Sequence, residues 1–491
     1  IVEAAPPIPN QAGLDAGRRI LALLESAGAD DLVIVLLSGG GSPQVQQGPA
    51  QKPPQGDRQA AFVSTVLAST EPGRAFGRYS YVGWDPVGSS RALDPLEGAP
   101  ALERGELEHV PRFVGVLPYE AFRGLERPRW TSEERRAEPL VRDVEWIELG
   151  AMAGVDHERG EVYAVARSEP EAVRAAALFD GAARGEVELS LEAEDAESLA
   201  LHQTRIERAI ELVVAGDLYQ VNLARAIELC VRGAGGAAPD GRVYLELFAR
   251  LSGASPTPFG ALLSLASGAR VLSTSPELFL DALPDASRSS FSELSTEPIK
   301  GTRPRAPDAA VDRALREELD SDPKERAELS MIVDVERNDL ARVSIPGSVR
   351  VAGEPEVQSF RTVHHRVARV SGSVRPGVSR AEVLAALLPS GSVTGAPKVR
   401  AMEVIGALEP RRRGLYTGAL GYLAHGGALR LSMAIRCAVF DASGRGEYLV
   451  GGGVVADSDP SREVEETRWK ASQISQVAER AAQGGPGVRR M

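Results

Sequence analysis

Two short segments far apart in the chain each present acidic side chains on one face of an expected helix. The first carries Glu325 and Glu328 at a spacing of i, i+3, just after a proline suited to a helix start. The second carries Glu463, Glu466 and Lys470 at i, i+3 and i+7. Two such helices can hold a hard divalent cation such as Mg²⁺, with water and substrate oxygens completing its coordination. The alternative is that both segments are solvated helix faces.

The composition excludes several classes of function. The chain has 491 residues, of which 43% are hydrophobic and 25% charged, as in ordinary globular proteins. Its net charge of -12 argues against nucleic acid or an anionic membrane as the main partner. No apolar run approaches the ~18 residues of a membrane helix, and we find no signal peptide. Cys230 and Cys437 show neither metal-ligand spacing nor a disulfide framework, so we expect a reducing, cytoplasmic location.

The first sixty residues differ from the rest. Residues 14–28 are typical of a helix, and residues 31–37 of a buried strand that ends in the glycine-rich loop Ser38–Ser42. Such a loop can cradle a phosphate with its backbone N–H groups. Residues 13–42 resemble a fragment of the glycerate 2-kinase family. We interpret residues 1–59 as an atypical extension and linker, fused or misjoined, and Ile1 indicates a fragment or a processed chain.

From residue 60 the pattern changes to alternating strands and amphipathic helices. Predicted strands lie at residues 76–83, 113–120 and 162–166. Residues 169–195 are predicted to form a helix followed by a polar connector. Another helix begins near His202, where Ile206, Ile210 and Val213 recur at helical spacing. We expect an N-terminal subdomain over residues 60–195 and a catalytic domain over residues 196–485.

The half of the chain from Asp217 to Lys470 is dense in polar motifs that suit catalysis. Lys300 lies in the run Pro-Ile-Lys-Gly-Thr. A lysine acts as a nucleophile only after losing its proton, which burial or a neighbouring cation such as Arg303 or Arg305 favours. Taken alone, the same run also fits a surface lysine in a loop.

Other motifs offer an acid and groups that bind anions. Glu277, in Ser-Pro-Glu, can act as a general acid, although the motif alone also fits a plain turn. Arg436 is the single arginine of an alternating strand, and its planar fork suits a carboxylate. A strand-edge salt bridge is the alternative. The glycines Gly451–Gly453 let a backbone approach a ligand closely, and Tyr416 can donate a phenolic hydrogen bond.

These motifs, in this order, resemble the chorismate-utilising enzymes, the family of anthranilate synthase component I and aminodeoxychorismate synthase component I. The resemblance is strong over residues 217–476 and weaker over residues 60–147. It implies an α+β fold, an α/β sandwich with large antiparallel sheets flanked by helices. It also implies Mg²⁺ as the cofactor and chorismate, a dianion, as the substrate.

Carried over residue by residue, the resemblance implies a role for each of these side chains. Lys300 is the nucleophile, Glu277 protonates the departing C4 hydroxyl, and His365 lies near them. The implied metal ligands are Glu328 and Glu466, with Glu325 and Glu463 beside them. The implied substrate contacts are Thr302, Tyr416, Arg436, Gly451, Gly453 and Lys470. Lys398 is either structural or senses substrate charge, and we interpret residues 334–340 as packing at a helix end.

One side chain distinguishes the branches of the family. A lysine before Gly-Thr, here Lys300, resembles the aminodeoxychorismate branch of folate and para-aminobenzoate biosynthesis, whereas anthranilate synthases of tryptophan biosynthesis usually carry alanine there. Gln220 stands where the salicylate and isochorismate relatives carry a lysine base that activates water. An amine product is therefore favoured. We predict an aminodeoxychorismate synthase component I, with anthranilate synthase component I as the alternative.

The resemblance also predicts a partner. Neither cysteine lies in a glutaminase motif, so we expect ammonia from a separate glutamine amidotransferase subunit. The segment Ser255–Phe259 resembles a tryptophan-binding segment of relatives but departs from it at Thr257 and Phe259, which puts tryptophan regulation in doubt. A third hypothesis is a non-catalytic fusion whose Ser38–Ser42 loop binds phosphate or nucleotide. The intact catalytic set argues against it.

Overall fold

The computed structural model describes residues 63–68, 78–96, 109–123, 138–158, 161–166, 187–287, 289–360 and 362–482. Within these ranges eighteen strands join in one antiparallel sheet and three in a second. The large sheet consists of β1 (Val63–Ala68), β2 (Tyr79–Ser90), β3 (Pro111–Leu117), β4 (Glu145–Asp156), β5 (Glu161–Ala166), β6 (Leu189–Asp195), β7 (Gln220–Gly233), β8 (Phe259–Ser264), β9 (Arg270–Ser275), β10 (Leu278–Pro284), β11 (Phe291–Glu297), β13 (Arg350–Val351), β16 (Val370–Ser373), β17 (Gly395–Ala396), β18 (Ala419–Ala424), β19 (Leu429–Met433), β20 (Cys437–Phe440) and β21 (Arg445–Val454).

The small sheet and the helices complete the described part of the chain. The small sheet holds β12 (Ile299–Pro304), β14 (Glu356–Ser359) and β15 (Val363–Val367). The α-helices are α2 (Tyr119–Arg123), α4 (Leu199–Val214), α5 (Gly241–Ala254), α6 (Ala309–Ser321), α7 (Pro323–Ala341), α8 (Arg380–Leu387), α9 (Lys398–Leu408) and α10 (Pro460–Ala482). Two 3-10 turns are η1 (Ala234–Gly236) and η2 (Gly391–Val393).

The large sheet consists of two halves joined through β4. Hydrogen-bonded neighbours run β6–β7–β21–β20–β9–β8–β1–β2–β4 in the first half. From β4 the ladder continues β3–β18–β19–β10–β11–β16–β13. Apolar residues of both halves, among them Leu263 and Val271 from the first and Val114 and Leu420 from the second, pack in one interior cluster. Burying these alternating side chains holds the halves together.

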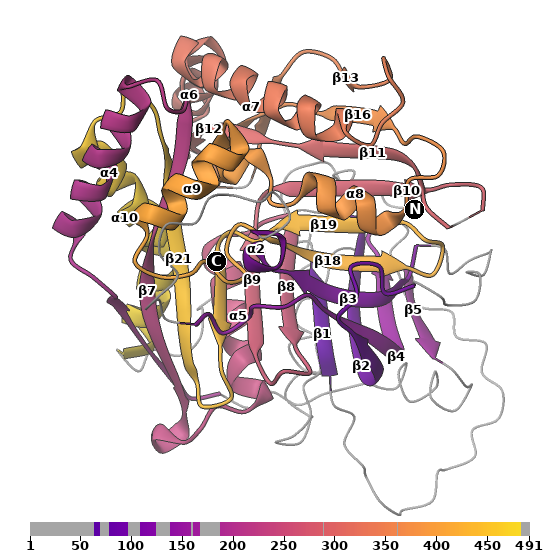
Figure 1. Cartoon of the computed structure of the whole chain (residues 1–491). Helices are drawn as coiled ribbons and strands as arrows, with labels where there is room; N and C mark the ends of the chain where they lie inside the picture. Colours follow the sequence, from indigo (N-terminus) through magenta and orange to yellow (C-terminus); the bar gives the residue numbers. More distant parts are fainter. Residues whose placement is uncertain are drawn as a thin grey trace, which may run out of the picture.

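Helices cover the two halves separately. On the first half α5 and α10 pack against β20 and β21, where Phe248 and Ile474 share a cluster with Phe440. On the second half α7 and α8 lie over β10, β11 and β16, and Leu329 shares a cluster with Leu294. Figure 1 shows α6 and α7 along the top of the molecule and α4 and α10 along its left side. The predicted α+β fold, with large antiparallel sheets flanked by helices, is confirmed.

Two of the places where the chain passes from one half of the sheet to the other lie next to each other. One is the link between β9 and β10, which contains Glu277, and the other is the link between β19 and β20, which contains Arg436. The backbone of Thr274 donates to the Arg436 carbonyl at 3.1 Å, and that of Met433 donates to the Glu277 carbonyl at 3.0 Å. The topology therefore brings an acid and a guanidinium together at the junction of the two halves.

Predicted elements that fall within the described residues lie where the sequence placed them, with one correction, whereas the helix predicted after residue 169 lies outside the described residues. Strands β2, β3 and β5 and helix α4 overlap the predicted segments. Residues 189–195 were predicted as a polar connector but form β6, paired with β7. Leu189 and Leu191 are buried and alternate with exposed Ser190 and Glu192, so β6 is a strand with one solvated face. The Ser38–Ser42 loop and the rest of residues 1–59 lie outside the described residues, and no described helix is long and apolar enough to span a membrane.

Candidate active site

A cavity of about 450 Å³ opens beside the junction of the two halves. Every residue that the sequence analysis proposed for catalysis, substrate binding or metal binding lines this one cavity. They are Glu277, Lys300, Thr302, Glu325, Glu328, His365, Tyr416, Arg436, Gly451, Gly453, Glu463, Glu466 and Lys470. The sequence analysis missed several lining residues, notably Asn222, Lys324, Ser392 and Trp469. These residues lie inside segments that carry motifs, but the sequence analysis gave them no role, and their position in the fold is what assigns them to the cavity.

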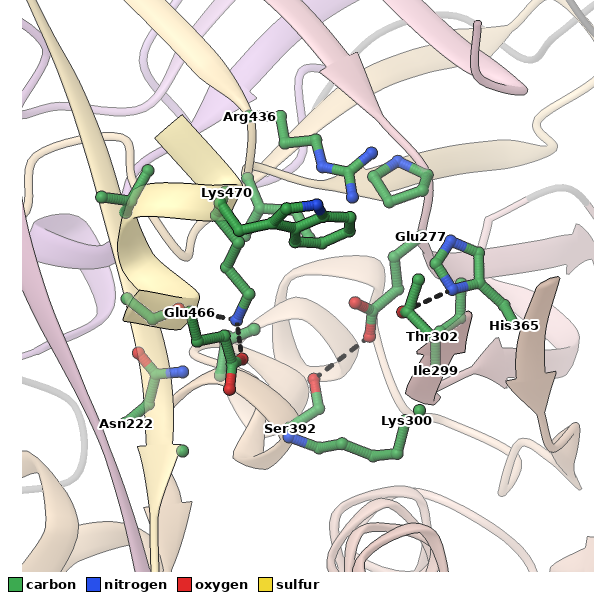
Figure 2. Close-up of a pocket in the computed structure, with 18 of the residues that line it drawn as sticks. Asn222, Glu277, Ile299, Lys300, Thr302, His365, Ser392, Arg436, Glu466 and Lys470 are labelled. Atoms are coloured by element: carbon green, nitrogen blue, oxygen red, sulfur yellow. Dashed lines mark hydrogen bonds and ion pairs between the residues drawn. The ribbon is translucent and has the colours of Figure 1, made fainter. Parts of the chain in front are cut away.

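Glu277 and Arg436 lie together in the cavity (Figure 2). Burial raises the pKa of the Glu277 carboxyl to about 7, against the opposing effect of the Lys300 charge. The Ser392 hydroxyl donates to Glu277 Oε1 at 3.5 Å. Arg436 adopts a left-handed backbone conformation (φ 53°), and its Nη1 donates to the Ser255 hydroxyl at 3.3 Å. A protonated carboxyl and a guanidinium in one buried site can supply an acid and an anion anchor.

Lys300 reaches the cavity from β12. Gly301, which follows it, has a φ of 83°, and a Cβ there would lie 2.7 Å from Leu319 Cδ1. This glycine permits the irregularity in the pairing of β12 with β15, and residues 300–302 all line the cavity. In Figure 2 the Lys300 side chain extends past Ser392 towards the side of the cavity that holds Asn222 and Glu466. The lysine is therefore a cavity residue and not a surface one.

The two arginines expected to assist Lys300 have other partners. Arg303 forms ion pairs with Glu318 at 2.8 Å and with Asp322 at 3.0 Å. Arg305 forms an ion pair with Asp312 at 2.7 Å and donates to the Phe360 carbonyl. Their charges are balanced by α6 and by the cap of α7, so the prediction that they act on Lys300 is not supported.

Thr302 and His365 face each other across the small sheet. The two residues pair in the β12–β15 ladder, and Thr302 Oγ1 lies 2.9 Å from His365 Nδ1. The His365 side chain is buried, and its ring packs edge-on against Phe360. The hydrogen bond orients the imidazole beside Glu277, which is consistent with the predicted role of His365 in the reacting region.

Four carboxylates from two helices also line the cavity. Glu325 and Glu328 come from α7, and Glu463 and Glu466 come from α10. Lys470 lies 2.6 Å from Glu466, and Lys324 lies 3.7 Å from Glu328. The two acidic helix faces therefore line the same cavity, with lysines balancing part of their charge.

This donor set fits Mg²⁺. Burial raises the pKa of the Glu463 carboxyl, whose Oε2 atom is enclosed with no hydrogen-bond donor among the described residues. Over the described part of the chain, however, no three Asp, Glu, His or Cys side chains lie close enough to enclose a metal ion by themselves. Mg²⁺ usually keeps several water or substrate ligands, so one carboxylate from each helix is a sufficient set of protein ligands.

Strand β21 forms one wall of the cavity, at positions where only glycine fits. A Cβ at Gly453 would lie 2.3 Å from Gln220 Nε2 and 3.7 Å from Lys300 Nζ. A Cβ at Gly451 would lie 2.9 Å from the Tyr416 hydroxyl, and the Gly451 carbonyl accepts from Lys470 Nζ at 2.8 Å. The glycines therefore let backbone, lysine and tyrosine groups converge on the same space.

Lys398, whose role the sequence analysis left open, and the segment 334–340, which it interpreted as packing, have defined positions. Lys398 Nζ lies 2.7 Å from Asp339 Oδ2, both side chains are buried, and Lys398 is not among the cavity-lining residues. This position is consistent with the structural alternative for Lys398. In the segment 334–340, Leu340 packs in the core as predicted, but Glu336 accepts a hydrogen bond from the Ser390 hydroxyl at 2.7 Å.

Known proteins match the chain in two separate blocks. Residues 68–476 match the family model of the chorismate binding enzymes, and residues 1–60 match a domain of unknown function (DUF4147). The chain is 39% identical over 277 residues to anthranilate synthase component 1 of Streptomyces coelicolor, covering 56% of this chain and 51% of that protein. It is 42% identical over 229 residues to aminodeoxychorismate synthase component 1 of Salmonella typhimurium, covering 47% and 48%. The chain therefore spans about half the length of these two relatives.

Longer alignments extend the similarity to most of the chain. Anthranilate synthase component 1 of Thermus thermophilus is 33% identical over 468 residues, which cover 87% of this chain and 94% of that protein. The fold is similar to the crystal structure of anthranilate synthase component I from Streptococcus pneumoniae, with a TM-score of 0.66, 25% identity, and coverage of 81% of this chain and 92% of that one. With the motifs, the cavity and the matched residues in agreement, the chain belongs to the family of chorismate binding enzymes.

Proposed function

We propose that this chain converts chorismate and ammonia to 4-amino-4-deoxychorismate, with the ammonia released by a glutamine amidotransferase partner. The position of Lys300 carries the proposal: its amine enters the cavity that also holds Glu277, Arg436 and the acidic faces of α7 and α10. Among the described residues, Lys300 forms neither a hydrogen bond nor an ion pair that would occupy its nitrogen. An amine so placed is available to attack a bound ring.

In the proposed reaction Lys300 is the nucleophile and Glu277 is the acid. Lys300 adds at C2 of chorismate, the ring double bonds shift, and the C4–O bond breaks. Glu277 gives its proton to the departing hydroxyl, which leaves as water; burial raises its pKa to about 7, so the carboxyl holds that proton near neutral pH. Ammonia then forms the C4–N bond, the double bonds shift back, and Lys300 leaves C2. The new amine leaves with all three hydrogens of ammonia as an ammonium group, so each turnover consumes one proton from Glu277.

The remaining residues bind and orient the substrate. Arg436 suits one carboxylate of chorismate, and Tyr416, whose phenol stays protonated because burial raises its pKa, can donate to the same group. Mg²⁺ held by Glu328 and Glu466 would draw charge from the carboxylate on C1 and make the ring more electrophilic.

The second candidate function is anthranilate synthesis, in which ammonia attacks C2 directly. The observation in its favour is that relatives named for each activity match at comparable identity, 39% and 42%. The two functions differ in whether Lys300 forms a bond to the substrate.

A product assay separates the two functions. Wild type and Lys300→Ala are incubated with chorismate, ammonium and Mg²⁺, and the products are identified by mass spectrometry. We expect 4-amino-4-deoxychorismate from wild type, and from wild type without ammonium a Lys300 peptide that carries chorismate minus water. Lys324→Ala is the matched control, because Lys324 lines the same cavity but pairs with Glu328. The control should change the rate without changing the product. Anthranilate from wild type, with no adduct on Lys300, would favour the second candidate.

The partner is tested separately. The relatives carry the words component 1 in their names, which supports a second component that supplies ammonia. Glutamine alone should not replace ammonium for this chain, and it should do so once a glutamine amidotransferase subunit is added. Turnover with glutamine alone would contradict the proposal.

A further inference from the structure

In the described part of the chain, two residues other than glycine have a left-handed backbone. They are Thr417, with a φ of 61°, and Arg436, with a φ of 53°. Arg436 lines the cavity, and Thr417 directly follows Tyr416, which lines it as well. A left-handed φ is unfavourable for a residue with a Cβ, and more so for threonine, which is branched at Cβ. Such a conformation persists where the surrounding structure imposes it, and it is commonest at functional sites.

Hydrogen bonds and close packing hold the backbone around Thr417. Its N–H donates to the Ala434 carbonyl at 2.9 Å, and the Ala434 N–H donates to the Gly418 carbonyl at 2.8 Å. Gly418 is packed so closely that a Cβ there would lie 2.2 Å from the carbonyl oxygen of Leu117, the last residue of β3. The backbone at residues 417 and 418 is thereby fixed against β3 and against the link between β19 and β20.

The threonine hydroxyl adds two contacts that glycine could not make. Thr417 Oγ1 donates to the Tyr416 carbonyl at 2.6 Å and accepts from Arg413 Nη1 at 3.1 Å. Thr417 is 0% exposed, so bulk water does not compete for these bonds. Arg413 also lies over the Tyr416 ring, with its guanidinium carbon 5.6 Å from the ring centroid. One guanidinium therefore contacts both the left-handed residue and the aromatic ring before it.

The Tyr416 ring reaches the cavity with a hydroxyl that can bind a ligand. A Cβ on Gly451 would lie 2.9 Å from the Tyr416 hydroxyl and 2.9 Å from Asn222 Oδ1, so these groups border the same space. Within the described residues no hydrogen bond occupies the phenolic oxygen. Burial raises the pKa of the phenol, so it is a donor at neutral pH. The side chain is 7% exposed and closely surrounded, so its backbone decides where the hydroxyl lies.

We propose that Thr417 is a positioning residue whose left-handed backbone aims the Tyr416 hydroxyl at a carboxylate of chorismate. The inference rests on the proposed function for the identity of this ligand. If the φ of Thr417 returned to negative values, the peptide that joins it to Tyr416 would turn, and the phenol would move away from the ligand. The hydrogen bonds to Arg413 and Ala434 offset the cost of the left-handed φ. Because the donor is already in place, binding energy is not consumed in ordering it.

Two substitutions with opposite properties test the proposal. Thr417→Gly removes the side chain but keeps the left-handed backbone, which glycine adopts freely. Thr417→Val keeps the shape of the side chain but loses the hydroxyl and disfavours the left-handed φ. If Thr417 only filled space, valine would be the better replacement, because glycine leaves a cavity. The proposal predicts the reverse order for chorismate binding. Thr417→Ser, which keeps the hydroxyl, is the conservative variant that should restore binding.

Isothermal titration calorimetry with chorismate and Mg²⁺ measures the affinity. Each variant is made in the Lys300→Ala background and titrated without ammonium, so that no amination occurs whichever product the chain makes. We expect Thr417→Val to raise the Kd for chorismate about 10-fold, the loss expected for one hydrogen bond to a charged group. Thr417→Gly and Thr417→Ser should raise it less than about three-fold, because both retain the left-handed backbone. Urea unfolding checks that each variant folds. If Thr417→Val does not fold, Thr417→Ala replaces it, since alanine also disfavours this φ.

A double-variant cycle with Tyr416→Phe shows whether the effect passes through the phenol. Tyr416→Phe should raise Kd about 10-fold, and adding Thr417→Val should raise it no further, because the positioned donor is already gone. The proposal is overturned if glycine binds chorismate worse than valine, or if the two losses multiply to about 100-fold. Equal affinity of all variants overturns this inference alone. If neither wild type nor Lys300→Ala binds chorismate, the proposed function itself fails.

Discussion

Replacing Arg413 with methionine removes one partner of a buried ion pair behind the cavity wall. The Arg413 and Glu409 side chains are 1% and 3% exposed, and Nη2 lies 2.7 Å from Oε1. The guanidinium also donates to the carbonyls of Val393 at 3.1 Å and Asn222 at 2.7 Å. Both of these residues line the cavity. The substitution therefore tests whether this pair holds the site together.

The expected cost follows from the burial of the pair. Removing one member of a fully buried ion pair leaves an unpaired charge and typically costs 3–5 kcal/mol. Two backbone carbonyls lose a donor as well, so we expect Arg413→Met to lower the free energy of unfolding by about 4 kcal/mol. The neighbouring Arg412→Met is the matched control. Arg412 pairs at 3.2 Å with Glu138, which is 61% exposed, and such a pair contributes about 0–1 kcal/mol.

Urea unfolding of the two variants and wild type measures the difference. The double variant Glu409→Leu/Arg413→Met should lose less than the sum of the two single variants, because no lone charge remains buried. The Ala224 backbone N–H, which donates to Glu409 at 2.8 Å, limits that recovery. A loss of unfolding free energy below about 1 kcal/mol for Arg413→Met would refute the reasoning, because the pair would then contribute no more than a surface salt bridge does.

Three further predictions follow from the site. Burial raises the pKa of Glu336 from 4.5 to about 7, so its contribution to stability is present below pH 4.5 and lost as pH rises through 7. Between pH 5 and pH 8 the free energy of unfolding of wild type should therefore fall by up to ~3 kcal/mol more than that of Glu336→Gln. Urea unfolding at several pH values measures this difference, and an equal pH dependence of the two proteins would contradict the prediction. Chelation by EDTA should abolish chorismate turnover, and Glu466→Gln should raise the Mg²⁺ concentration needed for half activity at least ~10-fold. Glu465→Gln should leave that Mg²⁺ concentration unchanged, because the Glu465 side chain is 69% exposed. Equal effects of the two substitutions would mean that Glu466 is not a metal ligand. Gly453→Ala should lower kcat/KM at least ~10-fold, because the new methyl group would overlap Gln220 Nε2 and lie against Lys300 Nζ. Gly253→Ala, with open space around it, should not lower kcat/KM, and steady-state kinetics of both variants checks this.

Much of the site could be predicted from the sequence because its residues occur in short runs. The i, i+3 spacing of Glu325 and Glu328 needs only a helix, and Asp322, which caps α7 by accepting from the backbone of Lys324, with Pro323 after it, starts that helix locally. The resemblance to a known family then selected one function among several. Residues whose role depends on a distant neighbour were missed. Ser392 and Glu336 are separated by more than fifty residues and meet only where η2 packs on α7.

Two other expectations from the sequence also failed because they depend on contacts between distant segments. Arg303 and Arg305 lie near Lys300 in the chain, but both form ion pairs with carboxylates of α6 or of the cap of α7. The strand β6 was predicted as a connector because its outer face is polar, and only pairing with β7 shows that Leu189 and Leu191 face a core. Residues that are close in the sequence need not share ion pairs or packing contacts once the chain is folded.

The sequence by itself determined which chemical groups this protein offers: a lysine, a glutamate after a proline, a lone strand arginine, and carboxylates at helical spacing. These depend on local periodicity, capping and turn chemistry, which act over a few residues. The tertiary structure decided where the groups meet and how they behave. Two crossings between sheet halves place Glu277 beside Arg436, and burial at that junction raises the pKa of Glu277 to about 7. Desolvation and long-range contacts are properties of the packed whole, so no single segment of the chain carries them.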